Sequence, residues 1–402
     1  MKSIRTLLIL GPGPSSSHTI GPFRIANSFK EEVKEYKPSL INVILYGSLA
    51  LTGEGHGTSK IIKKALSEYP TDIEFVKSFK NLKHPNTMDC IAYSSFGKEI
   101  KRERYLSIGG GSFVKEGERI SNKETYPFSS FEELKKLMKK ENIDDLYRII
   151  EKYEDKDIFN YGKELLLASF KTLESSLEKE GILPGKLHLE RTAKKIKEKA
   201  EQLSSPMDRK LLLLTSYAYA ISEANACGEM IVTTPTCGAA GVVPANLYLA
   251  KEEGFSIDEL VKSYLVGALV CLFIKENAGA SGALLGCQSE IGSAASFAAA
   301  SLSYLNKLSL YQIEYACEVA MEHFLGLTCD PVDGYVQIPC IERNGIAAIH
   351  AYSSFLYGKN IALSRINRVS FDNVILAMKE TGKGLRKEFK ETSLGGLAKV
   401  VC

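Results

Sequence analysis

SLYQIEYACEVAMEHF, residues 309–324, carries the helical pattern that decides the fold of the C-terminal half. Ser309 and Gln312 are spaced as a capping box, in which each side chain bonds a backbone N–H of the other residue. The apolar residues recur at intervals of three and four and so share one helix face: Leu310, Ile313, Cys317, Ala320, Met321 and Phe324. Cys317 is therefore predicted to be a core residue.

The same period continues through most of residues 161–402, which predicts a mostly all-α domain. Residues 1–113 instead mix strand-like runs, such as LINVILYGSLAL, with glycine-rich turns and short helical segments. Residues 114–160 are charged and helical, with a capping box expected at Ser130 and Glu133. The sequence thus predicts an α+β protein: a mixed α/β domain with its helical connection in residues 1–160, followed by a mostly all-α domain in residues 161–402.

The composition is that of an ordinary globular protein, with 45% apolar and 25% charged residues and a net charge of +3. Basic residues fall mainly in mixed-sign helices, which argues against nucleic-acid binding. The N-terminal apolar run is too short for a signal peptide. The apolar stretch at residues 263–280 is interrupted by Lys275 and Glu276, so we expect a core helix and no membrane span. We expect a cytoplasmic protein.

Nine cysteines in a reducing compartment do not indicate a disulfide framework. Three of them lie in apolar runs and are predicted to be core residues (Cys90, Cys271 and Cys317), and two lie at glycine-rich turns where a functional role stays open (Cys227 and Cys237). Cys287, Cys329 and Cys340 lie in polar, loop-like contexts that suit a metal cluster. Their spacing does not match a ferredoxin, and tight helix packing is the alternative.

Two histidines lie in motifs that indicate ligand binding. GPGPSSSHTIGP, residues 11–22, can hold an anion with backbone N–H and hydroxyl donors, but it lacks the lysine of a nucleotide-binding P-loop. His56 lies between two glycines in GSLALTGEGHGTS, where a functional role and a plain exposed loop remain open. TTPTCGAAGVVPAN and KENAGASGALLGCQSEIG either pack helices closely or bind a small polar ligand.

Taken together and in order, these motifs resemble the iron–sulfur L-serine dehydratases. The resemblance rests on GPGPSSSHTIGPFRIA, YGSLALTGEGHGT, KHPNTM, SIGGGSF, TTPTCGAAGVVPA, GASGALLGCQSEIGSAASFAAA, MEHFLGLTCDPVDGYVQIPCIERN and KETSLGGLA. It implies conversion of L-serine to pyruvate and ammonia, a homodimer, and a [4Fe–4S] cluster held by Cys287, Cys329 and Cys340, with one iron lacking a protein thiolate. Many relatives have asparagine where this chain has Cys237, which we expect near the substrate and not as a primary ligand.

The resemblance also directs the remaining assignments. His18 and His56 are the candidate catalytic residues, with His56 as base or proton relay. We expect the following residues to bind substrate: Ser15, Ser16, Ser17, Thr236, Asn277, Ser281 and Arg343. Cys402 is a candidate displaceable fourth ligand of the cluster, and a frayed terminus is the alternative. Because the histidines and the cysteines belong to different domains, we expect the site at the domain interface.

Three other functions stay open on sequence alone. A pyridoxal-phosphate dehydratase would need a Schiff-base lysine motif, which is not evident, although GGGSF at residues 109–113 could form a phosphate cup. A related cluster-dependent lyase would act on L-cysteine and release sulfide. An iron–sulfur sensor would bind a ligand without turnover.

Overall fold

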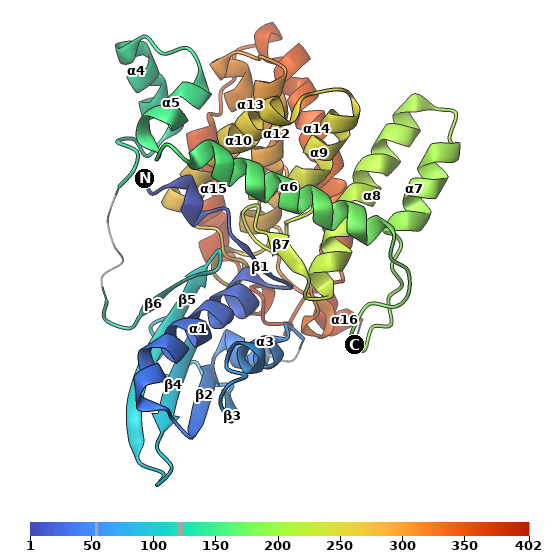
Figure 1. Ribbon diagram of the computed structural model, residues 1–402. Coiled ribbons are helices and arrows are strands. Elements are labelled where there is room, and N and C mark those ends of the chain that lie inside the picture. The colour runs from blue at the N-terminus through green and yellow to red at the C-terminus, as the bar shows by residue number, and fades with distance from the viewer. Residues whose placement is uncertain (53–54, 119–123, 402) are drawn as a thin grey trace.

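A five-stranded sheet and the helices on one of its faces form the lower part of the molecule in Figure 1. The computed structural model describes residues 1–402 except 53–54, 119–123 and 402. The strand order is β3-β2-β4-β5-β6, with β2 and β3 parallel and the other neighbours antiparallel. The strands are β2 (Leu40–Tyr46), β3 (Thr71–Val76), β4 (Thr87–Tyr93), β5 (Glu99–Gly109) and β6 (Ser112–Lys115).

One face of this sheet packs against α1 (Gly21–Val33) and α3 (Thr58–Ala65), with the short α2 (Ser48–Leu51) following β2. Strand β2 alternates buried and half-buried residues, which is the period expected of a strand with one covered face. Its inward residues, Ile41, Val43 and Leu45, join the α1 side chains in one apolar core. The α/β character predicted for this part of the chain is confirmed.

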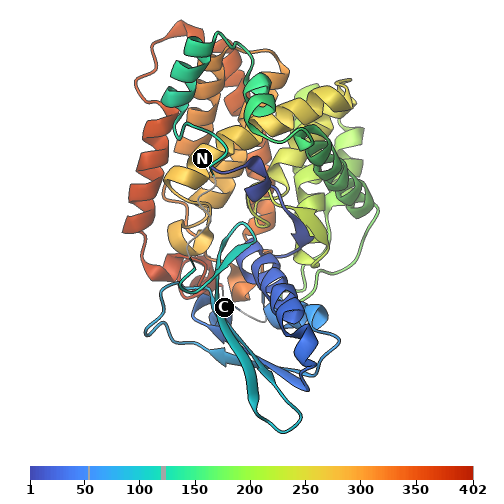
Figure 2. The same ribbon diagram turned by 60° about the vertical axis from the view of Figure 1, so that its left-hand side comes forward.

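The rest of the chain forms a helical body above the sheet, as both views show (Figures 1 and 2). Its helices are α4 (Phe131–Glu141), α5 (Leu146–Tyr153), α6 (Ile158–Leu177), α7 (Ala193–Gln202), α8 (Pro206–Ala226), α9 (Val242–Glu252), α10 (Ile257–Asn277), α11 (Gly282–Leu285), α12 (Ser293–Leu305), α13 (Leu310–Glu322), α14 (Cys340–Asn360), α15 (Phe371–Gly384) and α16 (Leu397–Val400). The mostly α-helical character predicted for the C-terminal part is also confirmed.

Helix α12 is the centre of this body and is buried on almost every side. Its small alanines and serines let α10, α13, α14 and α9 approach closely. Ser296 Oγ donates a hydrogen bond of 2.9 Å to the carbonyl of Cys317 on α13. The apolar stretch predicted to be a core helix is α10. Among the described residues, no helix is long and apolar enough to cross a membrane.

The two parts of the chain are joined at several places. Strand β1 (Leu10–Pro12) pairs antiparallel with β7 (Met230–Val232), so the segment before the histidine motif is held against the helical body. Residues near the N-terminus and in α4 and α5 share one apolar core with α10 and α15, for example where Phe131 contacts Phe273 and Phe371. The domain boundary placed at residue 160 stays a prediction.

Of the two predicted capping boxes, the one at the start of α13 is confirmed and the one at the start of α4 is wrong in one of its two hydrogen bonds. At α13 the predicted box between Ser309 and Gln312 forms in both directions. At α4, Ser130 accepts a hydrogen bond from the Glu133 backbone N–H, but the Glu133 carboxylate accepts from Ser129 N–H at 2.6 Å and not from Ser130. The N-terminal donors of α4 are satisfied instead by Asp372, which accepts from the N–H groups of Phe131 and Glu132.

Candidate active site

The serine-rich motif forms a tight turn at the start of α1. Ser16–Ile20 adopt a π-helical turn, and Ser15 caps it by accepting a hydrogen bond from the backbone N–H of His18 at 3.2 Å. Ser107, on β5, donates its hydroxyl to the carbonyl of Ser17 at 2.7 Å, which ties the turn to the sheet. A π-helical turn often marks a functional position, and here it holds the three serines and His18 inside the protein.

His18 and His56 lie side by side, with ring centroids 4.7 Å apart, and both are buried. His18 contacts hydroxyls through both ring nitrogens: Nδ1 lies 2.9 Å from Ser17 Oγ and Nε2 lies 2.9 Å from Ser48 Oγ. His56 is held by its backbone, because its carbonyl accepts a hydrogen bond from Thr19 Oγ1 at 3.1 Å. The two candidate catalytic histidines are thus brought together from different turns.

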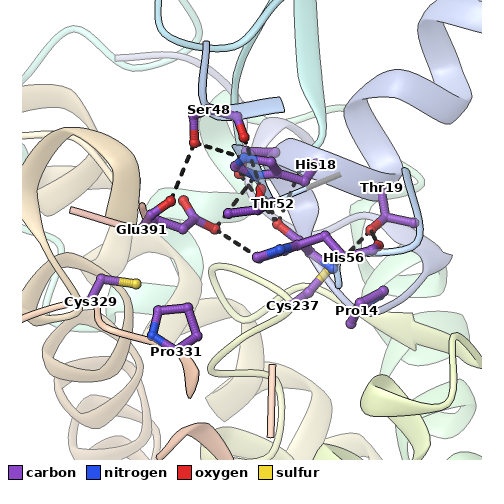
Figure 3. A network of polar contacts seen from close by, with 12 residues as sticks. Pro14, His18, Thr19, Ser48, Thr52, His56, Cys237, Cys329, Pro331 and Glu391 are labelled. Atoms are coloured by element: carbon purple, nitrogen blue, oxygen red, sulfur yellow. Dashed lines mark hydrogen bonds and ion pairs between the residues drawn. The ribbon is translucent and has the colours of Figure 1, made fainter. Parts of the chain in front are cut away.

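Glu391 joins the two histidines from the C-terminal segment of the chain, and sequence reasoning missed it. Figure 3 shows its carboxylate between both rings: Oε1 lies 3.5 Å from His18 Nδ1 and 3.6 Å from His56 Nε2. Its backbone has φ of +57°, which is uncommon for a residue with a side chain and is typically kept at functional sites. The only sequence signal was an acidic residue within KETSLGGLA.

Burial sets the charges in this group. It lowers the pKa of His18 from 6.5 to about 4, although the nearby Glu391 acts in the opposite direction. Burial also opposes ionisation of Glu391, but His18, His56 and the backbone N–H of Ala283 outweigh it, so the pKa of Glu391 is lowered. At neutral pH His18 is therefore neutral, and Glu391 presents a carboxyl oxygen to both histidine rings.

Cys287, Cys329 and Cys340 converge from three elements of the helical body. Cys287 precedes the π-helical turn Gln288–Gly292 that leads into α12, and Cys340 is the first residue of α14. Cys329 lies between α13 and α14 and pairs with the C-terminal segment: its N–H donates to Phe389 O at 2.8 Å, and Glu391 N–H donates to Cys329 O at 2.8 Å. The chain therefore connects the cysteines directly to the histidine group.

All three cysteines line one small cavity of about 20 Å³ at the meeting of the two parts of the chain. The other residues around it are Pro14, Ser15, His56, Gly238, Glu290, Pro331, Val336 and Glu391. Glu290 is half-buried there, and desolvation together with Glu391 and Cys287 raises its pKa well above the usual value. Glu290 is a second functional candidate that sequence reasoning missed, three residues after Cys287 in GCQSEIG.

The cysteines fit an iron–sulfur cluster by their chemistry. A hydrogen bond from Cys329 lowers the pKa of Cys287 to about 7 against the effect of burial, with help from Arg343. Arg343 lies close to all three thiols, donating to Thr328 O at 2.7 Å and to Asp330 Oδ1 at 3.1 Å. The pKa of Cys329 is raised by its hydrogen bond with Cys287 and by burial, and that of Cys340 is raised by burial, so bound iron would have to deprotonate both. Three soft sulfur donors beside a fixed cation and two helix starts are a donor set that suits iron and sulfide. The second possible ligand group is His18, His56 and Glu391, whose ligand atoms lie within 4.8 Å of one another.

The other predicted residues divide by location. Thr236 is buried, and its hydroxyl lies beside the Glu290 carboxyl, where a hydrogen bond from Thr236 opposes the rise in the pKa of Glu290. Asn277 lies outside the cavity, because its side chain donates to Ser129 O and Phe273 O. Ser281 precedes α11 and is buried, but it does not line the cavity.

Cys237 is buried, and its N–H donates to Ser16 Oγ at 3.4 Å. The predicted ligand Cys402 lies outside the described residues.

Comparison with known proteins places the chain in a family. Residues 114–398 match the family model of the serine dehydratase alpha chain, and residues 3–70 match that of the beta chain. The chain is 36% identical to an L-serine dehydratase of Streptomyces coelicolor, with 98% of each chain covered, and 36% identical to one of Helicobacter pylori, with 99% covered. An L-serine dehydratase of Haemophilus influenzae is 35% identical over the full length of both chains. The resemblance seen in the motifs is confirmed, and the chain belongs to the serine dehydratase family, with its alpha-chain and beta-chain parts on one polypeptide.

Proposed function

We propose that this protein is an L-serine ammonia-lyase, which removes water and then ammonia from L-serine to leave pyruvate. The observation that carries the proposal is the single cavity that His56 and Glu391 line together with Cys287, Cys329 and Cys340. Full-length similarity to enzymes named L-serine dehydratase supports the choice of substrate.

The three cysteine thiolates would hold a [4Fe–4S] cluster. When bound, such a cluster supplies a Lewis acid for the departing hydroxyl group. Among the described residues, no further cysteine lines the cavity. Cys402 remains our candidate for a fourth ligand that substrate displaces, on the sequence argument alone.

The remaining residues would bind serine and move its proton. The hydroxyls of Ser15, Ser16 and Ser17 and the neutral His18 would hold the substrate carboxylate, with Arg343 as a nearby cation and the Thr236 hydroxyl beside Glu290. His56 would take the α-proton, which is weakly acidic and needs a positioned base. The aminoacrylate that results tautomerises and hydrolyses to pyruvate and ammonia.

The test is an anaerobic preparation of the full chain. We expect a brown protein with about four irons per chain that forms pyruvate from L-serine and loses both colour and activity in air. Iron-free protein with full activity would refute the cluster, and an aldimine absorbance band would favour pyridoxal phosphate. Faster pyruvate release from L-cysteine, with sulfide, would favour the related lyase.

A further inference from the structure

The two histidines beside Glu391 differ in which ring atoms are free. Both nitrogens of His18 contact a serine hydroxyl, Ser17 Oγ at Nδ1 and Ser48 Oγ at Nε2. His56 has only one engaged nitrogen, because Nε2 faces Glu391 at 3.6 Å while Nδ1 is buried with no hydrogen-bond partner among the described residues. The base that the reaction needs must have a free lone pair, and of these two rings only His56 offers one.

An unpartnered buried nitrogen carries a cost. Leaving a buried polar atom unsatisfied is unfavourable, and such atoms call for a functional explanation. His56 and Glu391 both line the cavity that contains the three cysteines. The unsatisfied Nδ1 is therefore explained if a substrate atom comes to it during the reaction.

The carboxylate decides which nitrogen of His56 carries the proton. A neutral imidazole has one N–H and one lone pair, and a carboxyl oxygen 3.6 Å from Nε2, which can accept a hydrogen bond, favours the tautomer with the proton on Nε2. The lone pair then lies on Nδ1. The same carboxylate stabilises the imidazolium that forms when Nδ1 accepts a proton, which is the role that an acidic residue has beside a catalytic histidine.

The backbone of the C-terminal segment holds Glu391 in place for this role. Glu391 N–H donates to Cys329 O, and Cys329 N–H donates to Phe389 O, both at 2.8 Å. Ser393 Oγ donates to Pro331 O at 2.8 Å. These bonds clamp the segment on both sides of Glu391 and account for its left-handed backbone.

We propose that Glu391 is a positioning residue that fixes His56 with Nε2 protonated, so that His56 Nδ1 is the atom that takes the α-proton of serine. The inference rests on the proposed function and adds the base atom and its support. The Cα–H electron pair becomes the Cα=Cβ bond, the Cβ–O bond breaks with loss of hydroxide, and the proton stays on Nδ1 until it is returned to solvent.

The first variant is Glu391→Gln in the full chain, prepared anaerobically. A carboxamide removes the negative charge and can donate to Nε2, which selects the wrong tautomer. We expect kcat to fall by about 10²- to 10⁴-fold, the contribution typical of a general base, with little change in KM. Proton removal becomes slower, so the isotope effect with α-deuterated serine should rise, and the acidic limb of the kcat profile should move. Glu391→Asp keeps the charge and should recover part of kcat.

The control is Glu388→Gln, an acidic residue of the same segment whose side chain is 48% exposed. It should behave as wild type. Activities are compared per bound iron, so that a loss of cluster is not mistaken for a loss of the base. His56→Gln and the double variant complete a cycle: if Glu391 acts through His56, the double variant is no slower than His56→Gln alone.

Two results would overturn the inference. One is a Glu391→Gln enzyme with the kcat, pH profile and isotope effect of wild type, and the other is a double variant whose losses simply multiply. Both presuppose wild-type pyruvate formation from serine. Absence of that activity would instead refute the proposed function, so the two failures are distinguishable.

Discussion

Gly282, the first residue of α11, is the position where one added methyl group most directly tests the proposal that the three-cysteine cavity holds a cluster. A Cβ built there lies 2.7 Å from Glu290 Oε2 and 3.1 Å from Cys329 Sγ. Real Cβ atoms do not approach oxygen so closely, so one of the two side chains must move. The neighbouring cavity is only about 20 Å³, and the displaced carboxyl would take up space that the three cysteines share.

The expected energy of Gly282→Ala follows from two opposing effects. Replacing glycine by alanine where the backbone allows it stabilises a protein by about 0.4–1 kcal/mol. Overpacking a well-filled site costs about 1–3 kcal/mol. The fold should therefore survive with a net loss of at most about 2.6 kcal/mol of unfolding free energy. The iron and sulfide content of the variant should fall well below that of wild type, because the added methyl group crowds the proposed ligand Cys329.

The assay combines thermal unfolding with iron and sulfide analysis of anaerobic protein. Gly384→Ala is the matched control, since a Cβ at this last residue of α15 meets no atom within 4 Å. It should keep its iron and gain slightly in stability. If Gly282→Ala binds a full complement of iron and turns over serine at the wild-type rate, the placement of the cluster beside Gly282 is wrong.

Three other predictions test the site. Cys329→Ser should remove most of the bound iron, whereas Cys227→Ser should retain it, because Cys227 Sγ contacts Arg191 at 3.0 Å outside the cavity; iron analysis of both variants decides. Folded His18 stays neutral down to about pH 4 while the unfolded chain binds its proton near pH 6.5, so the free energy of unfolding should fall as pH decreases through this window. The loss is at most about 3 kcal/mol, and it should shrink in His18→Gln when urea unfolding is measured across the window. Deletion of Cys402 should speed oxygen damage or alter activation by serine, and unchanged cluster lifetime and kinetics would contradict its role as a ligand.

Local patterns in the sequence predicted the elements better than they predicted the site. The helical period identified α10 and α13, and the alternation of β2 identified a strand, because each pattern is set by one buried face. Sequence placed His18 and His56 in functional motifs, and they do meet. Asn277 does not line the cavity, because its amide donates to Ser129 O at the end of α10, and its predicted contact with substrate stays a prediction. The sequence does not reveal whether the side chain of a polar residue is already hydrogen-bonded to a backbone group and so cannot bind a ligand.

Glu391 shows why the central part of such a site escapes local reasoning. Its segment bonds to Ser48 across 343 residues of sequence, and no periodicity connects two segments so far apart.

The consequence is mechanistic as well as predictive. The segment that carries Glu391 is bonded on both sides to the backbone around Cys329, so the carboxylate that orients the base and a thiolate proposed to hold the cluster are fixed by the same hydrogen bonds. A change that breaks these hydrogen bonds should therefore displace both the Glu391 carboxylate and the Cys329 sulfur. We therefore expect variants of this segment that break its backbone pairing to lose iron and base catalysis together, whereas Glu391→Gln, which leaves that pairing in place, separates the two.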